Sequence, residues 1–330
     1  MIPFNPCKID KRSPSQTYCH SVFQKKIGFL TTRQKSSLMH WFYFALLAAL
    51  SESFKDLCSK RGLRTVSPQL AALAASATPI PFLFAILLFT GSMPILGPHY
   101  LLALLLGGTL NVLALFQFMR ALQASDMSLA IPFISFTPIF LLITSPLLVD
   151  DVPGIQDVAG ILCIVAGTYI LQIQSTQQGW LTPLWALVSQ PGPRRMLSVA
   201  LIYSITSNFD KIGVQNSSPL FWSLSITTVM TIGFFFMFRL MPRPTVAAPL
   251  TPILGILLAI GLFQAMGLYF HNTALSLGSV PSVIAIKRTS ILFAVLWGIV
   301  FLREPQGKER LAGAILMVVG ICILALGQHT

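Results

Sequence analysis

The sequence predicts an all-α polytopic membrane protein, with ten transmembrane helices arranged as two inverted five-helix repeats. Composition, recurring apolar runs and an internal repeat predict this fold. Of the 330 residues, 54% are hydrophobic and only 10% are charged, whereas roughly a quarter of the residues in a soluble domain are charged. The mean hydropathy is +0.75. Too few charged side chains are present to cover a surface in water, so the expected surroundings are lipid.

Apolar runs of about 20 residues recur along the chain, and each can cross a hydrocarbon core of roughly 30 Å as a helix. Backbone amides in lipid need internal partners, which leaves helices or a closed barrel. Barrel strands alternate apolar and polar residues, and these runs do not. Ten helices are therefore predicted, over about 40–58, 69–90, 99–122, 128–149, 155–173, 196–213, 219–239, 250–275, 280–302 and 309–327.

Helix-breaking residues support the ends of these runs. They follow the second, fourth, fifth, seventh and ninth runs, at Gly91–Pro98, Asp150–Gly154, Pro191–Pro193, Pro242–Pro249 and Arg303–Gly307. Residues 174–195 form the widest gap, and Trp180 and Trp185 within it predict a segment that lies at the membrane interface, where a short helix could form.

Residues 1–38 contain seven of the 22 Lys and Arg residues and no long apolar run, which predicts a basic disordered tail. Two alternatives remain, a transit-type peptide or untranslated sequence if synthesis begins at Met39. The net charge of +12 sits mostly in this tail and at the ends of apolar runs, a distribution typical of membrane topology rather than of nucleic-acid binding. Five scattered cysteines indicate neither disulfides nor a metal site, and no cofactor is expected.

An internal repeat is the most informative feature of the chain. A shift of 153 residues lays Ala121 on Ala274, Gly160 on Gly313 and Gly167 on Gly320 without a gap. A shift of 155 lays Phe54 on Phe209. We therefore expect one repeat over 39–173 and a second over 196–330. Five crossings per repeat invert the second copy, and such carriers bind their solute near the midplane, where the halves meet.

The two segments that end the repeats, LLVDDVPGIQDVAGILCIVAGTYIL and IVFLREPQGKERLAGAILMVVGICIL, resemble the paired domains of the EamA family in the drug/metabolite transporter superfamily. In that family each half closes with a helix, a short acidic turn and a Gly-rich helix. The second copy keeps the turn as Leu302-Arg303-Glu304, whereas the first has Asp150-Asp151 where glycine-glutamate is usual. The resemblance covers about 40–327 and implies a ten-helix solute permease with a central cavity.

Charged residues inside spans cost roughly 2.5–3.5 kcal/mol each, so they are functional candidates. Glu52 lies nearest the bilayer centre in the first helix, and it fits equally a proton or solute site and a polar patch neutralised by Lys55. Lys55 and Asp56 fit the patch better. The sixth helix repeats the pattern with Asn208, Asp210 and Lys211, as a site between repeats should, although an exposed helix end is the alternative.

Lys287 and Arg288 lie well inside the ninth span, and two cations at that depth need an anion. Here the sequence is similar to the plastid phosphate translocators, whose sites use a Lys-Arg pair in the ninth helix and a lysine in the sixth. Lys287, Arg288 and Lys211 fall at the matching positions, which implies a site for phosphate or carboxylate. The alternative is that these cations pair with Glu52, Asp56 or Asp210 and hold the halves together.

Other polar residues in the spans could line the pathway or bond neighbouring helices, namely Gln117 and Arg120 in the third helix and Gln264, His271 and Asn272 in the eighth. Three acidic and four basic groups in the first, sixth and ninth helices make the expected cavity slightly positive. An anionic or zwitterionic metabolite fits this charge better than a lipophilic cation does.

The predicted function is a secondary transporter of a small organic metabolite by alternating access, with the lipid bilayer as its surroundings and a proton or a counter-transported solute as a possible coupled partner. The plasma (inner) membrane is the expected location. No Walker A motif and no catalytic cluster is present, so an enzyme is not expected. An intramembrane enzyme and a channel or structural subunit remain the competing classes. Basic residues flank both sides of the spans, so orientation is open.

Overall fold

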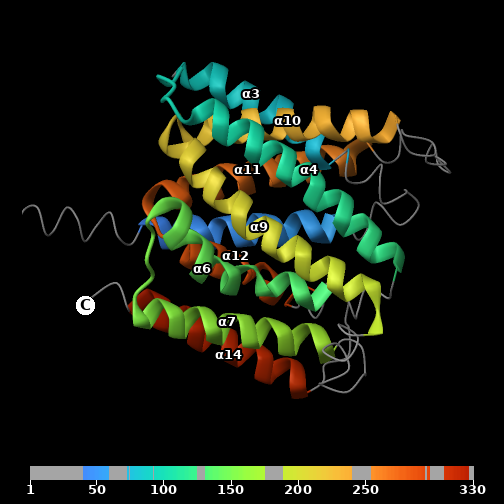
Figure 1. Ribbon diagram of the computed structural model, residues 1–330, viewed down its shortest axis with the longest axis vertical. Helices are drawn as coiled ribbons and strands as arrows, with labels where there is room; N and C mark the ends of the chain where they lie inside the picture. Colours follow the sequence, from blue (N-terminus) through green and yellow to red (C-terminus); the bar gives the residue numbers. More distant parts are fainter. Residues whose placement is uncertain are drawn as a thin grey trace, which may run out of the picture.

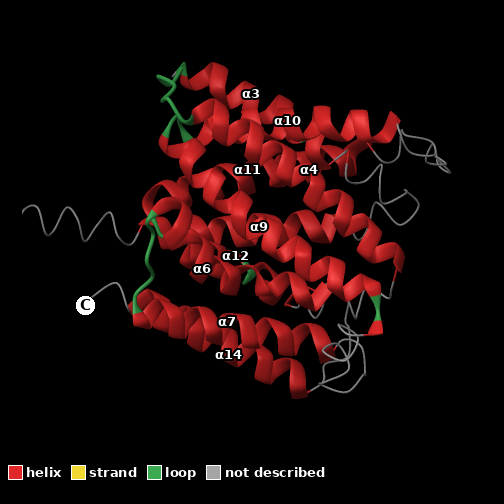
Figure 2. Cartoon of the chain, viewed as in Figure 1, coloured by secondary structure: helices red, strands yellow, loops and turns green. Residues whose placement is uncertain are grey.

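The computed structural model describes residues 40–58, 73, 75–91, 93–124, 131–174, 189–239, 254–293, 296–297 and 308–326. Helices joined by loops and turns make up these residues, and no strand occurs among them (Figure 2). The predicted tail over 1–38, most of the interfacial segment and the Leu302-Arg303-Glu304 turn lie outside the described residues.

Helices occur in all ten predicted spans, and together they form the all-α multi-pass membrane fold (Figure 1). After a first helix over 40–58, the chain forms the elements α3 (Pro79–Thr90), α4 (Tyr100–Ala124), η1 (Ile131–Phe136), α6 (Thr137–Val149), α7 (Ile155–Gln174), α9 (Pro191–Gln215), α10 (Pro219–Arg239), α11 (Leu254–Leu277), α12 (Val280–Lys287) and α14 (Lys308–Leu326). Three helices, α4, α10 and α11, are by length and composition able to cross a membrane within the described residues, and several shorter apolar helices accompany them.

Large apolar side chains cover much of the outer surface, as lipid requires. Phe89 in α3 is 93% exposed and Ile155 at the start of α7 is 91% exposed. In contrast, polar side chains such as Asn208, His271 and Asn272 are buried between helices. Apolar side chains therefore lie on the outside as well as in the core, and several polar side chains are kept inside, which suits a bilayer better than water.

Proline explains where two elements differ from the predicted ranges. The sequence suggests a break at Pro191–Pro193, but α9 begins at Pro191, five residues before the predicted start at 196. Proline in a first turn costs little, because the N–H groups there lack helical partners. In the fourth span, Pro132 lies in a 3-10 stretch, η1, and Pro138 lies in the first turn of α6, which follows it directly. Residues 131–149 therefore do not form one continuous α-helix.

The packing of α7 against α14 shows that the repeats are inverted. These helices, which close the two repeats, lie side by side (Figure 1). A Cβ added to Gly160 would lie 3.0 Å from the carbonyl oxygen of Gly320, and one on Gly167 would lie 2.7 Å from that of Gly313. The two helices therefore run antiparallel. Gly160 is equivalent to Gly313 and Gly167 to Gly320 in the repeat, so exchanging equivalent residues turns one contact into the other. A twofold axis between the helices requires this reciprocity.

Candidate functional site

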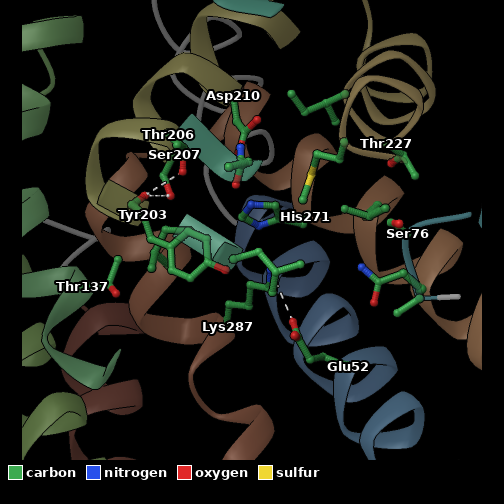
Figure 3. A pocket seen from close by; sticks show the side chains of 18 of the residues that line it. Glu52, Ser76, Thr137, Tyr203, Thr206, Ser207, Asp210, Thr227, His271 and Lys287 are labelled. Carbon is green, nitrogen blue, oxygen red and sulfur yellow. Dashed lines mark hydrogen bonds and ion pairs between the residues drawn. The ribbon is translucent and has the colours of Figure 1, made fainter. Parts of the chain in front are cut away.

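A cavity of about 470 Å³ lies between the two repeats, within the size range of small-molecule sites. The first helix, α4, α9, α10, α11, α12 and the residue that begins α6 all contribute to its wall (Figure 3). Its polar lining includes Glu52, Asp210, His271, Asn272, Lys287 and Arg288. Six of the nine residues predicted to bind solute therefore line one cavity.

Lys287 and Arg288 lie where the ninth span stops being a regular helix. Ser279 caps the start of α12, and the helix ends at Lys287. The backbone N–H of Arg288 still bonds to the carbonyl of Ile284, and a turn over 288–289 precedes helical residues 290–293. The C-terminal end of a helix carries partial negative charge, so it favours cations at these two positions.

A chain of ion pairs joins the first helix to α12 across the repeat boundary. Lys287 Nζ lies 3.3 Å from Glu52 Oε2, the pair drawn in Figure 3. Lys55 Nζ lies 3.0 Å from the other Glu52 oxygen and 3.4 Å from Asp56 Oδ1. Two cations and two carboxylates thus balance one another. For Lys287, this arrangement matches the alternative in which intramembrane charges pair and hold the halves together.

Arg288 lacks such compensation. Its Nη2 donates to the hydroxyl of Thr137 in α6, at 3.1 Å. Its Nε is buried and has no hydrogen-bond partner among the described residues. No described carboxylate lies within ion-pair distance of its guanidinium group. An arginine stays charged in a protein, so this partly buried cation favours an anionic partner.

Asp210 is the second group in the cavity without a counter-ion. Trp222 Nε1 of α10 donates to its Oδ1 at 3.0 Å, and no described cation forms an ion pair with it. In α11, Asn272 donates from its Nδ2 to Ser223 and leaves its buried Oδ1 without a partner. The Nδ1 of His271 is also buried without a partner. Three unsatisfied polar atoms from Arg288, His271 and Asn272 therefore belong to residues that line the cavity.

Lys211, Asn208 and Gln117 were predicted to bind solute, but they do not line this cavity. Lys211 donates to Asp151 at 3.1 Å and to the carbonyl of Gly278 at 3.0 Å. Asn208 is fully buried and bonds Ser145 and Thr144 of α6. Both residues thus connect the second repeat to other elements instead of facing the cavity.

Helix rotation accounts for the position of Gln117. The wall formed by α4 consists of Asn111, Leu115 and Phe118, which follow the spacing of one helix face. Gln117 is the neighbour of Phe118 in the sequence, so it lies about 100° around the helix from that position and off the cavity face. The polar residue that α4 does present to the cavity, Asn111, was not predicted.

The cavity face of α9 was also only partly predicted. Tyr203, Ser207 and Asp210 line the cavity together and lie three and four residues apart (Figure 3). The same spacing in the sequence, counted back from Asp210, would have identified Tyr203 and Ser207.

Comparison with known proteins gives a consistent assignment. A model described as the EamA-like transporter family matches residues 39–173 and 195–326. No curated protein matches the chain significantly. A solved structure described only as "Crystal structure of protein" is 16% identical and superposes with a TM-score of 0.71, over 89% of this chain and 98% of its own. That likeness concerns the fold alone.

Proposed function

Because this chain belongs to the EamA-like transporter family, and is therefore a membrane transporter, we propose that it is a secondary carrier for a small organic solute that bears an anionic group. The observation that carries the proposal is Arg288. It is a partly buried cation on the wall of a cavity between the repeats, with no carboxylate partner among the described residues and with a buried, unbonded Nε. A carboxylate or phosphate of the solute supplies what this group lacks.

The position of the cavity supports alternating access as the mechanism. Its wall combines Glu52 and Thr137 of the first repeat with Asp210 and Arg288 of the second. In inverted-repeat carriers, one repeat rocks against the other around a site at their interface. Contacts that cross the boundary, such as Lys287 to Glu52 and Arg288 to Thr137, would have to change during that motion.

The test is uptake of organic anions into proteoliposomes that contain the purified full-length chain. We expect saturable uptake that is stimulated when unlabelled solute is loaded inside, a response that a channel does not give. The variant Arg288→Gln should abolish uptake and remain folded in the membrane. The matched control is Arg239→Gln, because Arg239 ends α10 and stacks on Phe235 away from the cavity. Uptake by Arg288→Gln equal to that of the control would refute the proposal.

A further inference from the structure

We propose that the ion pair between Lys211 and Asp151 is a gate, which closes the cavity at one end of the helix bundle and opens when the solute passes through that end. The inference rests on the proposed function, because a carrier that works by alternating access needs one end closed while the other is open. It gives a role to a pair that joins the two repeats outside the lining of the cavity.

Lys211 and Asp151 lie beyond the cavity, at one end of the bundle. They connect three segments, which are α9, the loop after α6 and the turn between α11 and α12. In α6, α11 and α12 the cavity is lined by Thr137, Asn272 and Ile284, each at least one helical turn along the chain from the contacts of the pair. The pair therefore lies between the cavity and the surface at this end, which we call the gate end.

The lining of the cavity extends toward the opposite end of the bundle. Trp41 packs on Gly278 at the gate end, so the first helix leads away from that end to Lys55, which lines the cavity. The next case is α4, which begins beside the end of α9, because the N–H of Gly97 donates to the carbonyl of the residue that follows α9 at 2.8 Å. Phe118, near the other end of α4, lines the cavity. Lining residues thus reach the far parts of both helices.

Both contacts of the Asp151 carboxylate cross the boundary between the repeats. Its Oδ2 accepts from Lys211 Nζ at 3.1 Å and from the backbone N–H of Val280 at 2.7 Å. The gate end cannot open between the repeats unless these two contacts break. Once water enters, it hydrates both charged groups and offsets part of the lost attraction, which makes an ion pair suitable for repeated opening and closing.

The inverted repeat does not reproduce this pair at the opposite end. Under the shift of 155 residues, the residue of the first repeat that is equivalent to Lys211 is Asp56, a carboxylate. Asp56 pairs with its neighbour Lys55 at 3.4 Å. A carboxylate cannot replace the cation of the gate, so the pair favours the state of the empty carrier in which the gate end is closed.

The accessibility of a single cysteine in the cavity tests the gate. The reporter is Ser207→Cys on the cavity face of α9, in a full-length chain whose five native cysteines are replaced by alanine. A membrane-impermeant maleimide is added to vesicles that carry the protein in both orientations. An affinity tag at the C-terminus separates the two, because α14 ends at the gate end, where Leu324 contacts Gly160 near the start of α7.

Removing the charge of Asp151 should open the gate end. Asp151→Asn should raise the rate of labelling from this end about tenfold or more, because losing a bond between charged groups shifts the equilibrium toward the state that is open there. Asparagine keeps an oxygen that can accept from Val280. The matched control is Asp150→Asn, since Asp150 is the exposed neighbour and forms no ion pair with a described residue. The control should be labelled like the unmodified chain.

A second variant shows whether the two charges act as one pair. Lys211→Gln should give the same rise, and the double variant with Asp151→Asn should be labelled no faster than either single variant. Labelling from the opposite end should not rise in any of them, because an alternating carrier opens one end at a time. Additive increases in the double variant would contradict the gate.

The outcomes separate this inference from the proposed function. Equal labelling of Asp151→Asn and Asp150→Asn from the gate end overturns the gate and leaves the anion carrier standing. A rise from both ends also overturns it, because the pair would then serve only the fold. The labelling is measured without solute, so it does not depend on which anion is carried. Absence of saturable uptake by the unmodified chain overturns the proposed function instead.

Discussion

Lys211 Nζ lies 3.1 Å from Asp151 Oδ2, and this ion pair joins α9 of the second repeat to the loop that follows α6 in the first. The same carboxylate oxygen accepts from the backbone N–H of Val280 at 2.7 Å, where α12 begins. Lys211 also donates to the carbonyl of Gly278. One side chain from each repeat thus holds three segments together, next to the helix that carries Lys287.

Replacing Lys211 should therefore affect stability more than recognition. Both side chains of the pair are about 85% buried, because 13% and 15% of their surfaces are exposed. We expect Lys211→Gln to lower the free energy of unfolding by about 1–3 kcal/mol, since the partner carboxylate loses its cation. Thermal unfolding of the purified protein measures this. Unchanged stability combined with lost solute binding would instead place Lys211 in the solute site.

Gly167 should not tolerate a larger side chain. A Cβ at this position would lie 2.7 Å from the carbonyl oxygen of Gly313 and 2.8 Å from the backbone nitrogen of Met317. Gly167→Ala forces α7 and α14 apart, so we expect a loss of about 1–3 kcal/mol. Gly255→Ala in α11 is the matched control, because nothing lies within 4 Å of its added Cβ. If both variants unfold at the same temperature, the close packing of these helices contributes nothing.

Glu52 and Lys287 should be energetically coupled. Glu52→Gln leaves Lys287 without its counter-ion at 3.3 Å, and Lys287→Met leaves Glu52 with Lys55 alone. The double variant should lose less stability than the two single variants lose in sum. The difference, the coupling energy between the two residues, should be about 0.5–3 kcal/mol. A double-mutant cycle in thermal unfolding measures it. Additive effects would show that the ion pair does not hold the repeats together.

The two adjacent cations should differ in what can replace them. Arg288→Lys should lose most transport, because an ammonium group has no planar fork for a carboxylate. Lys287→Arg should keep transport, since Glu52 can accept from either side chain. Uptake into proteoliposomes compares the two variants. The opposite order of activity would make Lys287 the residue that binds the solute.

Much of the fold follows from the sequence, because lipid restricts the choices. Long apolar runs in a bilayer can only be helices, and five helices per repeat require inversion. Gly160, Gly167, Gly313 and Gly320 fall at equivalent positions of the two repeats in the sequence, and they allow close helix contact where α7 meets α14. The depth of Lys287 and Arg288 within an apolar run also indicated a buried site.

The tertiary structure decided which partner each charged residue meets and which of them line the cavity. Asp210 and Lys211 are neighbours, but successive residues on a helix point about 100° apart, so one faces the cavity and the other faces Asp151. Similarly, Lys287 is neutralised because the first helix brings Glu52 beside it, whereas Arg288 has a hydroxyl of α6 as its side-chain partner within the described part of the chain. Hydropathy determines that a segment is buried in the membrane, but the rotation and packing of distant helices determine which partner each charge meets.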